Sequence, residues 1–202
     1  MQRAPITVMP ASEADRGTTA AILARAFIDD PAMAYLFRNA DARPERLRRF
    51  FYLSTHVDGD PACWNLATDN GIPAAAAMWR PPGAWQTPSS AMLRWLPTLL
   101  HTFGFSLPRA LALQSVLESH HPHAPHWYLQ YVGCVPEAQG RGLGGAVIRD
   151  RLARCDAQRL PAALETATPG NVPIYQALGF TITSTYDIKT GPKFWTMWRN
   201  PR

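Results

Sequence analysis

The feature that most constrains this chain is the segment from Val132 to Gly145, in which an apolar run meets a cluster of glycines. The pattern predicts a strand, a turn and the start of a helix. Backbone N–H groups in the first turn of a helix lack internal partners, and the helix dipole is positive there, so such a turn attracts anions. Gly140, Gly142 and Gly144 also lack the Cβ atoms that would block a close approach. The segment therefore predicts a phosphate cradle.

Two other phosphate-binding motifs compete for the same glycines. Gly140-x-Gly142-x-x-Gly145 also fits the dinucleotide fingerprint, and Glu165 lies about 20 residues further on, where a ribose-binding acid would sit. This interpretation is disfavoured because residues 136–139 separate the predicted strand from the first glycine, and little chain follows for a second nucleotide-binding half. A triphosphate-binding loop would need Lys and then Ser or Thr after the last glycine, which the sequence lacks.

Length and composition predict one globular domain over residues 1–202, with 47% hydrophobic and 17% charged residues. No apolar run is long enough to span a membrane and no signal sequence is present, so we expect a cytoplasmic protein without a membrane partner. The basic residues behind the net charge of +5 are scattered, which predicts no nucleic-acid partner. Cys63, Cys134 and Cys155 lack metal-ligand spacing and are expected to be buried thiols, while the histidines of 120–126 are expected in a loop without zinc.

The hydrophobic pattern predicts an α/β (α+β) fold. The expected strands are residues 6–9, 64–68, 72–79, 127–135, 162–166, 180–187 and 194–198. The expected helices are 13–28, 31–52 with a break near 39–44, two short ones around 93–103 and 109–118, one from the glycine loop to 158, and one at 174–178. Asp69-Asn70-Gly71 predicts a hairpin turn. Residues 81–125 are a helical insertion that we expect to cover the substrate site.

A second motif agrees with the glycine loop. Gln139-x-x-Gly142-x-Gly144 is followed by Tyr175-x-x-x-Gly-Phe180, and in both motifs the chain resembles the GNAT superfamily of N-acetyltransferases. The resemblance implies a mixed, mostly antiparallel sheet splayed at its central strands, with helices on both faces, and acetyl-CoA as cosubstrate. From about residue 127 to 199 the chain also resembles puromycin N-acetyltransferase-like bacterial proteins, which implies antibiotic modification.

The same resemblance implies roles for individual residues. Tyr175 is expected to protonate the leaving thiolate as a general acid, although packing against the sheet would also explain it. Cys134 or Val135 is expected to supply a backbone N–H to the thioester oxygen. Asn171 is expected to bind the cofactor arm or to cap a helix. Cys134 as a nucleophile is disfavoured because no histidine motif accompanies it. The residues expected to hold acetyl-CoA are Cys134, Val135, Gln139, Gly140, Arg141, Gly142, Leu143, Gly144, Gly145 and Asn171.

Acetyl transfer also needs a general base, because only a neutral amine attacks a thioester. Glu165 is the leading candidate since it ends a strand near the glycine loop and Tyr175; Asp29, Asp30 and Glu137 are alternatives. The expected acceptor is the amine of a small molecule. Its pocket is expected to have aromatic walls, drawn from Tyr35, Phe37, Trp79, Trp85 and Trp95.

Two further functions fit the same motifs. The chain could acetylate a protein, or it could bind acetyl-CoA as a sensor without turnover. A homodimer is consistent with the sequence, and no metal is expected to take part.

Overall fold

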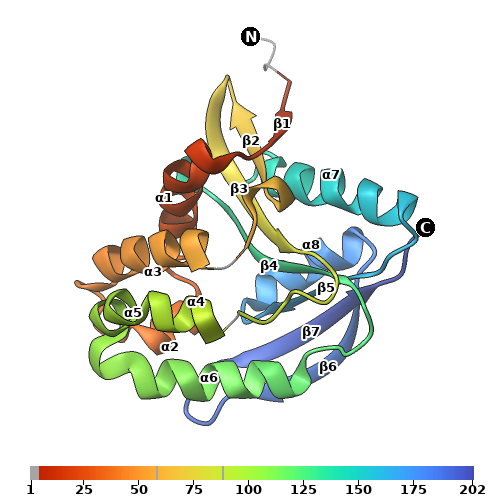
Figure 1. The fold of residues 1–202 in the computed structure, drawn as a ribbon. Helices are drawn as coiled ribbons and strands as arrows, with labels where there is room; N and C mark the ends of the chain where they lie inside the picture. Colours follow the sequence, from red (N-terminus) through yellow and green to blue (C-terminus); the bar gives the residue numbers. More distant parts are fainter. Residues whose placement is uncertain (1–4, 58, 88) are drawn as a thin grey trace.

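A seven-stranded sheet organises the protein (Figure 1). The computed structural model describes residues 5–57, 59–87 and 89–202; residues 1–4, 58 and 88, which the predicted domain includes, lie outside the described residues. The sheet order is β1-β2-β3-β4-β5-β7-β6, and every neighbouring pair is antiparallel except β4 and β5. The predicted mixed, mostly antiparallel sheet is confirmed. The strands are β1 (Thr7–Pro10), β2 (Asn65–Asp69), β3 (Ile72–Arg80), β4 (Trp127–Cys134), β5 (Ala162–Thr166), β6 (Thr181–Asp187) and β7 (Lys193–Arg199).

Helices pack against both faces of this sheet, as β3 shows most directly. Ala76 and Met78 belong to the core cluster beneath α1 and α3, whereas Ala75, Ala77 and Trp79 belong to the cluster beneath α7 and α8. Alternate residues of a strand point to opposite faces, so this strand is buried on both sides. The helices are α1 (Arg16–Ala26), α2 (Pro31–Leu36), α3 (Arg43–Val57), α4 (Ser89–Arg94), α5 (Leu96–Phe103), α6 (Leu107–His120), α7 (Leu143–Ala157) and α8 (Val172–Ala177).

The central strands β4 and β5 begin side by side and then separate. Their parallel pairing runs from Trp127↔Ala162 to Leu129↔Leu164 and stops there, although β4 continues to Cys134 along β3. At the point of separation Met78 faces Tyr131 and Trp79 faces Leu129, so Gln130 is the extra residue of a β-bulge. A bulge bends its strand. The splay that the resemblance implied is therefore present, and it opens the sheet between β4 and β5.

Close packing fixes the position of α1 over this opening. Gly133 lies in the separated part of β4, and a Cβ atom there would come within 2.5 Å of the Cβ of Ala26 and within 3.3 Å of Leu23. Glycine at this position therefore lets α1 lie directly on β4.

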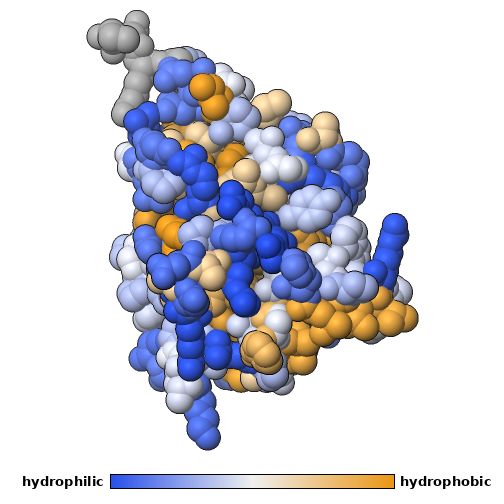
Figure 2. All heavy atoms as spheres, turned by 90° about the vertical axis from the view of Figure 1, so that its left-hand side faces the viewer, coloured by the Kyte–Doolittle hydropathy of each residue, from blue (hydrophilic) through white to orange (hydrophobic). Residues whose placement is uncertain are grey.

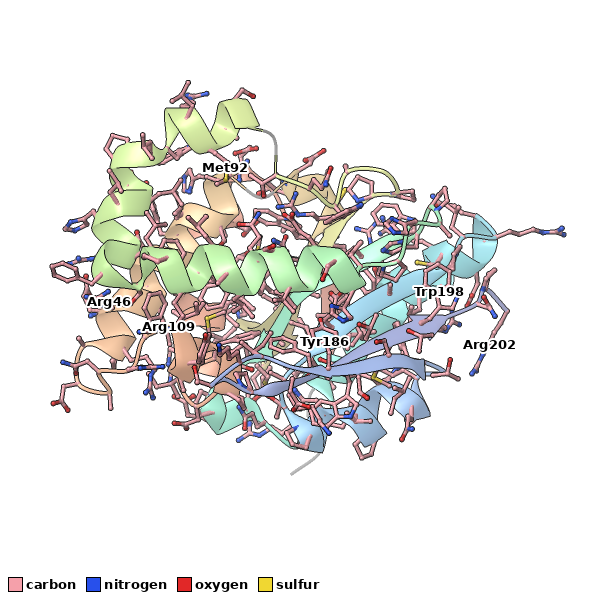
Figure 3. All side chains as sticks on the ribbon, turned by 90° about the horizontal axis from the view of Figure 1, so that it is seen from below. Arg46, Met92, Arg109, Tyr186, Trp198 and Arg202 are labelled. Carbon is pink, nitrogen blue, oxygen red and sulfur yellow. The ribbon has the colours of Figure 1, made fainter. Side chains whose placement is uncertain are left out.

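The insertion contains three helices, α4 to α6, where the sequence predicted two. Trp95 is the N-cap of α5 and Pro97 lies in the first turn of that helix, so the apolar stretch divides in two. Seen from below, α6 lies across the sheet (Figure 3). Contacts near both of its ends hold it in place. Arg109 donates to the carbonyls of Tyr35 and Leu36 at 3.1 and 2.9 Å. At the other end of α6, His120 stacks on Tyr186 with ring centroids 3.8 Å apart.

The inserted helices present apolar side chains to solvent as well as to the interior. Figure 2 shows hydrophobic side chains gathered low on one face of the molecule, and the exposed large apolar residues of the insertion are Leu93, Leu96, Leu100, Phe105 and Leu111. Within residues 5–57, 59–87 and 89–202, no helix combines the length and the hydropathy that crossing a membrane requires.

Candidate active site

The glycine loop joins the splayed end of β4 to the start of α7 through a short 3₁₀ turn (Pro136–Ala138). Gly140 and Gly142 have φ values of 71° and 88°, in a region that residues with a side chain rarely adopt. Gly142 is the N-cap of α7, and its carbonyl accepts from the N–H of Ala146 at 2.9 Å. The three N–H groups between them have no acceptor within the helix. A Cβ atom on Gly140 or Gly144 would meet nothing within 4 Å, so both glycines border open space. This cradle fits the pyrophosphate of acetyl-CoA.

Three other residues of the predicted cradle shape the loop with their side chains. Gln139 donates to the carbonyl of Cys134 at 3.2 Å. Arg141 forms an ion pair with Asp69 at the end of β2. Leu143, the first residue of α7, is fully buried in the core. These contacts hold the loop between two strands and the core.

The separated half of β4 carries backbone donors that face the opening. The N–H of Val135 donates to the carbonyl of Ala74 at 2.9 Å, so this pair is hydrogen-bonded in the ladder with β3. Bonded and non-bonded pairs alternate in an antiparallel ladder, and consequently the N–H groups of Val132 and Cys134 point away from β3, toward β5. Val135 therefore cannot supply the oxyanion N–H that the sequence analysis considered. Val132, which the sequence analysis missed, has the required orientation, as does Cys134.

Tyr175 lies on α8, buried to 7% exposure, with its ring edge-to-face against Phe180. Burial, and secondarily the nearby Asp30 carboxylate, raise the pKa of the Tyr175 phenol, so the hydroxyl holds its proton. Asp30 itself caps α2: it accepts from the N–H groups of Ala32 and Met33 and from the hydroxyl of Thr168 at 2.9, 3.0 and 3.1 Å. Asp30 thus caps α2 and also lines the cavity beside Tyr175. Burial raises the pKa of its carboxyl group, so Asp30 stays an alternative to Glu165 as the base.

Glu165 is a buried carboxylate at the separated end of β5. Its side chain is 3% exposed, and Oε1 lies 3.2 Å from Nδ1 of His121, whose side chain is 4% exposed. Oε2 of Glu165 and Nε2 of His121 have no hydrogen-bond partner in the described part of the chain. Burial and the neighbouring Glu165 carboxylate hold the pKa of Tyr128 well above its usual value. His121 stacks on Trp85 with centroids 4.0 Å apart, which fixes its ring against Glu165.

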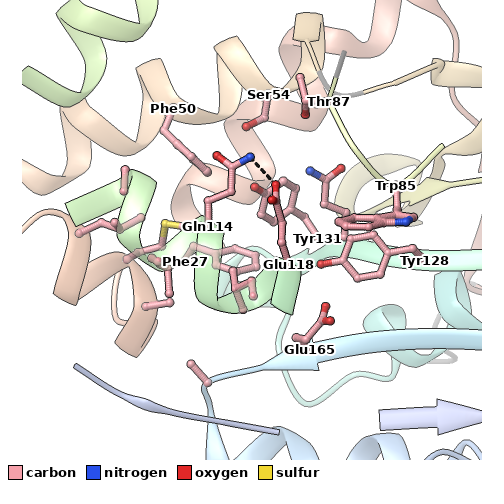
Figure 4. Close-up of a pocket in the computed structure, with 18 of the residues that line it drawn as sticks. Phe27, Phe50, Ser54, Trp85, Thr87, Gln114, Glu118, Tyr128, Tyr131 and Glu165 are labelled. Atoms are coloured by element: carbon pink, nitrogen blue, oxygen red, sulfur yellow. Dashed lines mark hydrogen bonds between the residues drawn. The ribbon is translucent and has the colours of Figure 1, made fainter. Parts of the chain in front are cut away.

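These side chains surround one cavity of about 440 Å³ on the α6 side of the opening (Figure 4). Tyr175, Asn171 and Glu165 line it together with Val132 of β4, and the inserted helices roof it. Asn171 is the N-cap residue of α8, yet its side chain makes no capping hydrogen bond. The structure thus brings three of the predicted site residues to a single space.

The histidines and the aromatic residues depart in part from the sequence expectations. His120 ends α6, whereas His121 and His126 lie in the expected loop and are buried there. His121 contacts Glu165 across 44 positions of sequence, and no spacing in the chain predicted that pair. Of the five aromatic residues expected in the pocket wall, only Trp85 lines the cavity. The other four pack into the two core clusters: Phe37 and Trp79 are fully buried there, and Tyr35 and Trp95 lie against the larger one.

The cysteines are free thiols, but of the three expected to be buried only Cys155 is; Cys63 and Cys134 are half-buried. Burial raises the pKa of Cys134, so its thiol stays neutral and is a poor nucleophile. Wherever the structure places residues, no three side chains of His, Cys, Asp or Glu come together as metal ligands.

Comparisons with known proteins agree with this geometry. No family model matches the chain. An uncharacterised N-acetyltransferase of Schizosaccharomyces pombe is 29% identical over 181 residues, which cover 82% of this chain and 70% of that protein. A Corynebacterium glutamicum structure described as histone acetyltransferase HPA2 and related acetyltransferase superposes with a TM-score of 0.76 at 25% identity, covering 98% of each chain. The polyamine N-acetyltransferase of Drosophila melanogaster superposes with a TM-score of 0.65 at 14% identity, over 97% of this chain and 100% of that one.

The splayed sheet, the glycine loop and these similarities define the class: the protein has the GNAT fold. Within that class, the chain is an acetyl-CoA-dependent N-acetyltransferase. The closer similarity to puromycin N-acetyltransferase-like proteins, and the antibiotic modification that it implied, stay predictions.

Proposed function

We propose that the protein transfers the acetyl group of acetyl-CoA to the amine of a small molecule, by direct attack in a ternary complex. One observation carries the proposal: the opening between β4 and β5 leads into a cavity of about 440 Å³ that three inserted helices roof. A cavity of this size suits a small molecule. A protein substrate would need an open groove at the same place.

In this proposal the glycine loop holds the pyrophosphate with the backbone N–H groups at the start of α7. The N–H groups of Val132 and Cys134 bind the arm of the cosubstrate and the thioester oxygen, and Asn171 binds the arm from the side of α8. Acetyl-CoA supplies the acetyl group as an activated thioester. Donors fixed on a strand before the reaction need no rearrangement to stabilise developing negative charge.

The protons of the reaction are assigned to two residues. The amine nitrogen forms a bond to the acetyl carbon while the bond from carbon to sulfur breaks, which leaves one proton too many on nitrogen and one too few on sulfur. Tyr175 donates its proton to the leaving sulfur. Glu165 accepts the proton from nitrogen, and His121 orients Glu165 through the contact at 3.2 Å. Because burial raises the pKa of Tyr175, the phenol enters each cycle protonated.

Acetylation of a protein is the second candidate, because the Corynebacterium glutamicum structure with a TM-score of 0.76 is described as a histone acetyltransferase. The roof formed by α4 to α6 argues against it, since those helices cover the site that a peptide would have to reach.

Release of free thiol from acetyl-CoA, measured against a panel of small amines and against peptides with free amino groups, distinguishes the candidates. We expect release with small amines and none with peptides or without amine. Calorimetry of acetyl-CoA binding is the control for a folded cosubstrate site. Tight binding with no release for any amine or peptide would instead support a sensor.

A further inference from the structure

The cavity has two ends of different chemistry. Carboxylates line the end beside the opening in the sheet, where Glu165 of β5 and Glu118 of α6 lie with Tyr128 and Trp85 (Figure 4). The other end lies among α3, α5 and the first half of α6. Its lining there is aliphatic and aromatic, with Leu53, Leu99, Phe103, Leu107 and Leu113, and no carboxylate of these three segments faces it within the described residues.

Carboxylates outnumber cations around the cavity. Asp30, Glu118 and Glu165 line it, whereas Arg80 is the one Lys or Arg of the lining within the described residues, and His121 contacts Glu165 at 3.2 Å. The Glu165 side chain is 3% exposed, and its Oε2 has no hydrogen-bond partner in the described residues. Glu118 accepts from Nε2 of Gln114 at 2.8 Å. The cavity also contains Arg80, but its guanidinium bonds Gln130 at 2.8 Å and backbone carbonyls of the following loop. An excess of carboxylates over cations around a largely buried cavity is costly, so this end favours a cationic ligand group.

We propose that the acceptor is a monoamine with an apolar, largely aliphatic body. Its amine group binds as the ammonium between Glu165 and Glu118, next to the opening, and loses one proton to water before the neutral nitrogen attacks. Its body extends under the insertion toward α5. This inference rests on the proposed function and names the class of amine. A diamine or polyamine of equal length would place its second charge among leucine side chains, where no described residue compensates it.

Chain length and terminal charge test the proposal. We expect kcat/KM for acetylation to rise from butylamine to hexylamine to octylamine, by about fourfold for each added methylene, until the cavity is full. The diamine with the same chain length as octylamine should react at least roughly tenfold less efficiently, because its far ammonium must leave water. Equal or better rates with the diamine, or rates independent of chain length, would overturn the proposal.

A matched pair of variants tests where the apolar body of the amine binds. Ala110 of α6 lines the cavity, whereas Ala112 is exposed on the same helix. Ala110→Phe should lower kcat/KM for octylamine by about tenfold or more and leave butylamine within about twofold, since the ring fills the apolar end. Ala112→Phe should match the wild type with both amines. An equal loss of kcat/KM for octylamine and butylamine in Ala110→Phe would contradict the proposed position of the apolar body.

Binding separates a failure of this inference from a failure of the proposed function. Calorimetry of alkylamines with the wild type and with Ala110→Phe measures amine binding in the cavity without turnover. Length-dependent binding that Ala110→Phe abolishes, without thiol release, would keep the cavity assignment and refute small-amine acetylation. Thiol release with polyamines in preference to alkylamines would keep the function and refute the inference.

Discussion

At the residue scale, two buried acids of the site are controlled by their neighbours. The pKa of the Tyr175 phenol is raised by burial and by Asp30, so the residue is a proton donor and not a phenolate. The Glu165 side chain lines the cavity, and its Oε2 is buried without a hydrogen-bond partner in the described residues. Both environments come from packing, because neither residue is distinguished by its immediate sequence neighbours.

Replacement of Tyr175 by Phe tests the proposed general acid. We expect kcat to fall by roughly 10² to 10⁴, because the thiolate would leave without a proton, while acetyl-CoA affinity changes little. Thiol release and calorimetry measure the two quantities. Tyr52→Phe, at a half-exposed tyrosine outside the cavity, is the control. Turnover unchanged in Tyr175→Phe would refute the role.

Replacement of Glu165 by Gln tests the proposed base. The amide has nearly the shape of the carboxylate but cannot accept the proton, so we expect kcat/KM to fall by roughly 10² or more. Glu45→Gln is the matched control, because Glu45 is exposed on α3, outside the cavity, and pairs with Arg48 and Arg49. A similar loss in both variants, or in neither, would remove Glu165 from the mechanism.

At the scale of elements, contacts between segments position the site. The opening between β4 and β5 needs the bulge at Gln130 and the direct packing of α1 on Gly133. The far end of α7 is tied to β7, since Asp156 accepts two hydrogen bonds from Arg199 at 2.7 and 2.8 Å and a third from the N–H of Arg202 at 2.8 Å. Each contact fixes one boundary of the cradle or of the cavity.

Gly133→Ala should destabilise the fold. The new Cβ would lie 2.5 Å from that of Ala26, so α1 must move, at a cost of about 1 to 3 kcal/mol. Gly17→Ala, in α1 itself, is the control. A Cβ atom at this position meets nothing within 4 Å, and we expect unchanged or slightly higher stability. Urea unfolding measures both. Equal stability of the two variants would show that α1 adjusts freely.

Asp156→Asn should lower stability by about 2 kcal/mol at neutral pH, because buried Arg199 loses its counter-charge. The hydrogen bonds from Arg199 hold the pKa of Asp156 below its usual 3.8. A carboxyl with a lowered folded-state pKa stabilises the fold above its unfolded-state pKa, and that contribution is lost as the pH falls through the folded-state value. Unfolding free energies of wild type and variant should therefore converge below pH 3.8. A difference that stays constant with pH would contradict this.

At the scale of the whole molecule, the proposed cosubstrate site lies between two core clusters on opposite faces of the sheet. Acetyl-CoA should consequently stabilise the entire fold, since a ligand that binds only the native state adds about 2.7 kcal/mol at 100 times its Kd. We expect Tm to rise with acetyl-CoA concentration in the wild type. Gly144→Val, which puts a side chain into the open cradle, should keep the Tm of the free protein and lose most of the rise. A full rise in Tm with acetyl-CoA in this variant would show that the pyrophosphate binds elsewhere.

The sequence by itself determined the features that depend on neighbouring residues. Positive φ at Asn70 and Gly71 confirms the hairpin between β2 and β3, and the apolar pattern located every strand and the helices that flank the sheet. The two motifs were enough to indicate an acetyltransferase, because a strand, a glycine turn and a helix start form a local unit. The helices of the insertion were predicted less accurately. The sequence analysis missed α4, because it took the segment on both sides of Pro97 as one helix.

Only the tertiary structure decided how distant segments meet. The ladder between β3 and β4 turned the N–H of Val132 toward the opening and that of Val135 away from it. Packing of α6 across the sheet brought His121 to Glu165, and the aromatic residues that line the cavity are, apart from Trp85, other ones than those expected. Register and long-range packing are properties of two segments at once, so no pattern within either one could specify them.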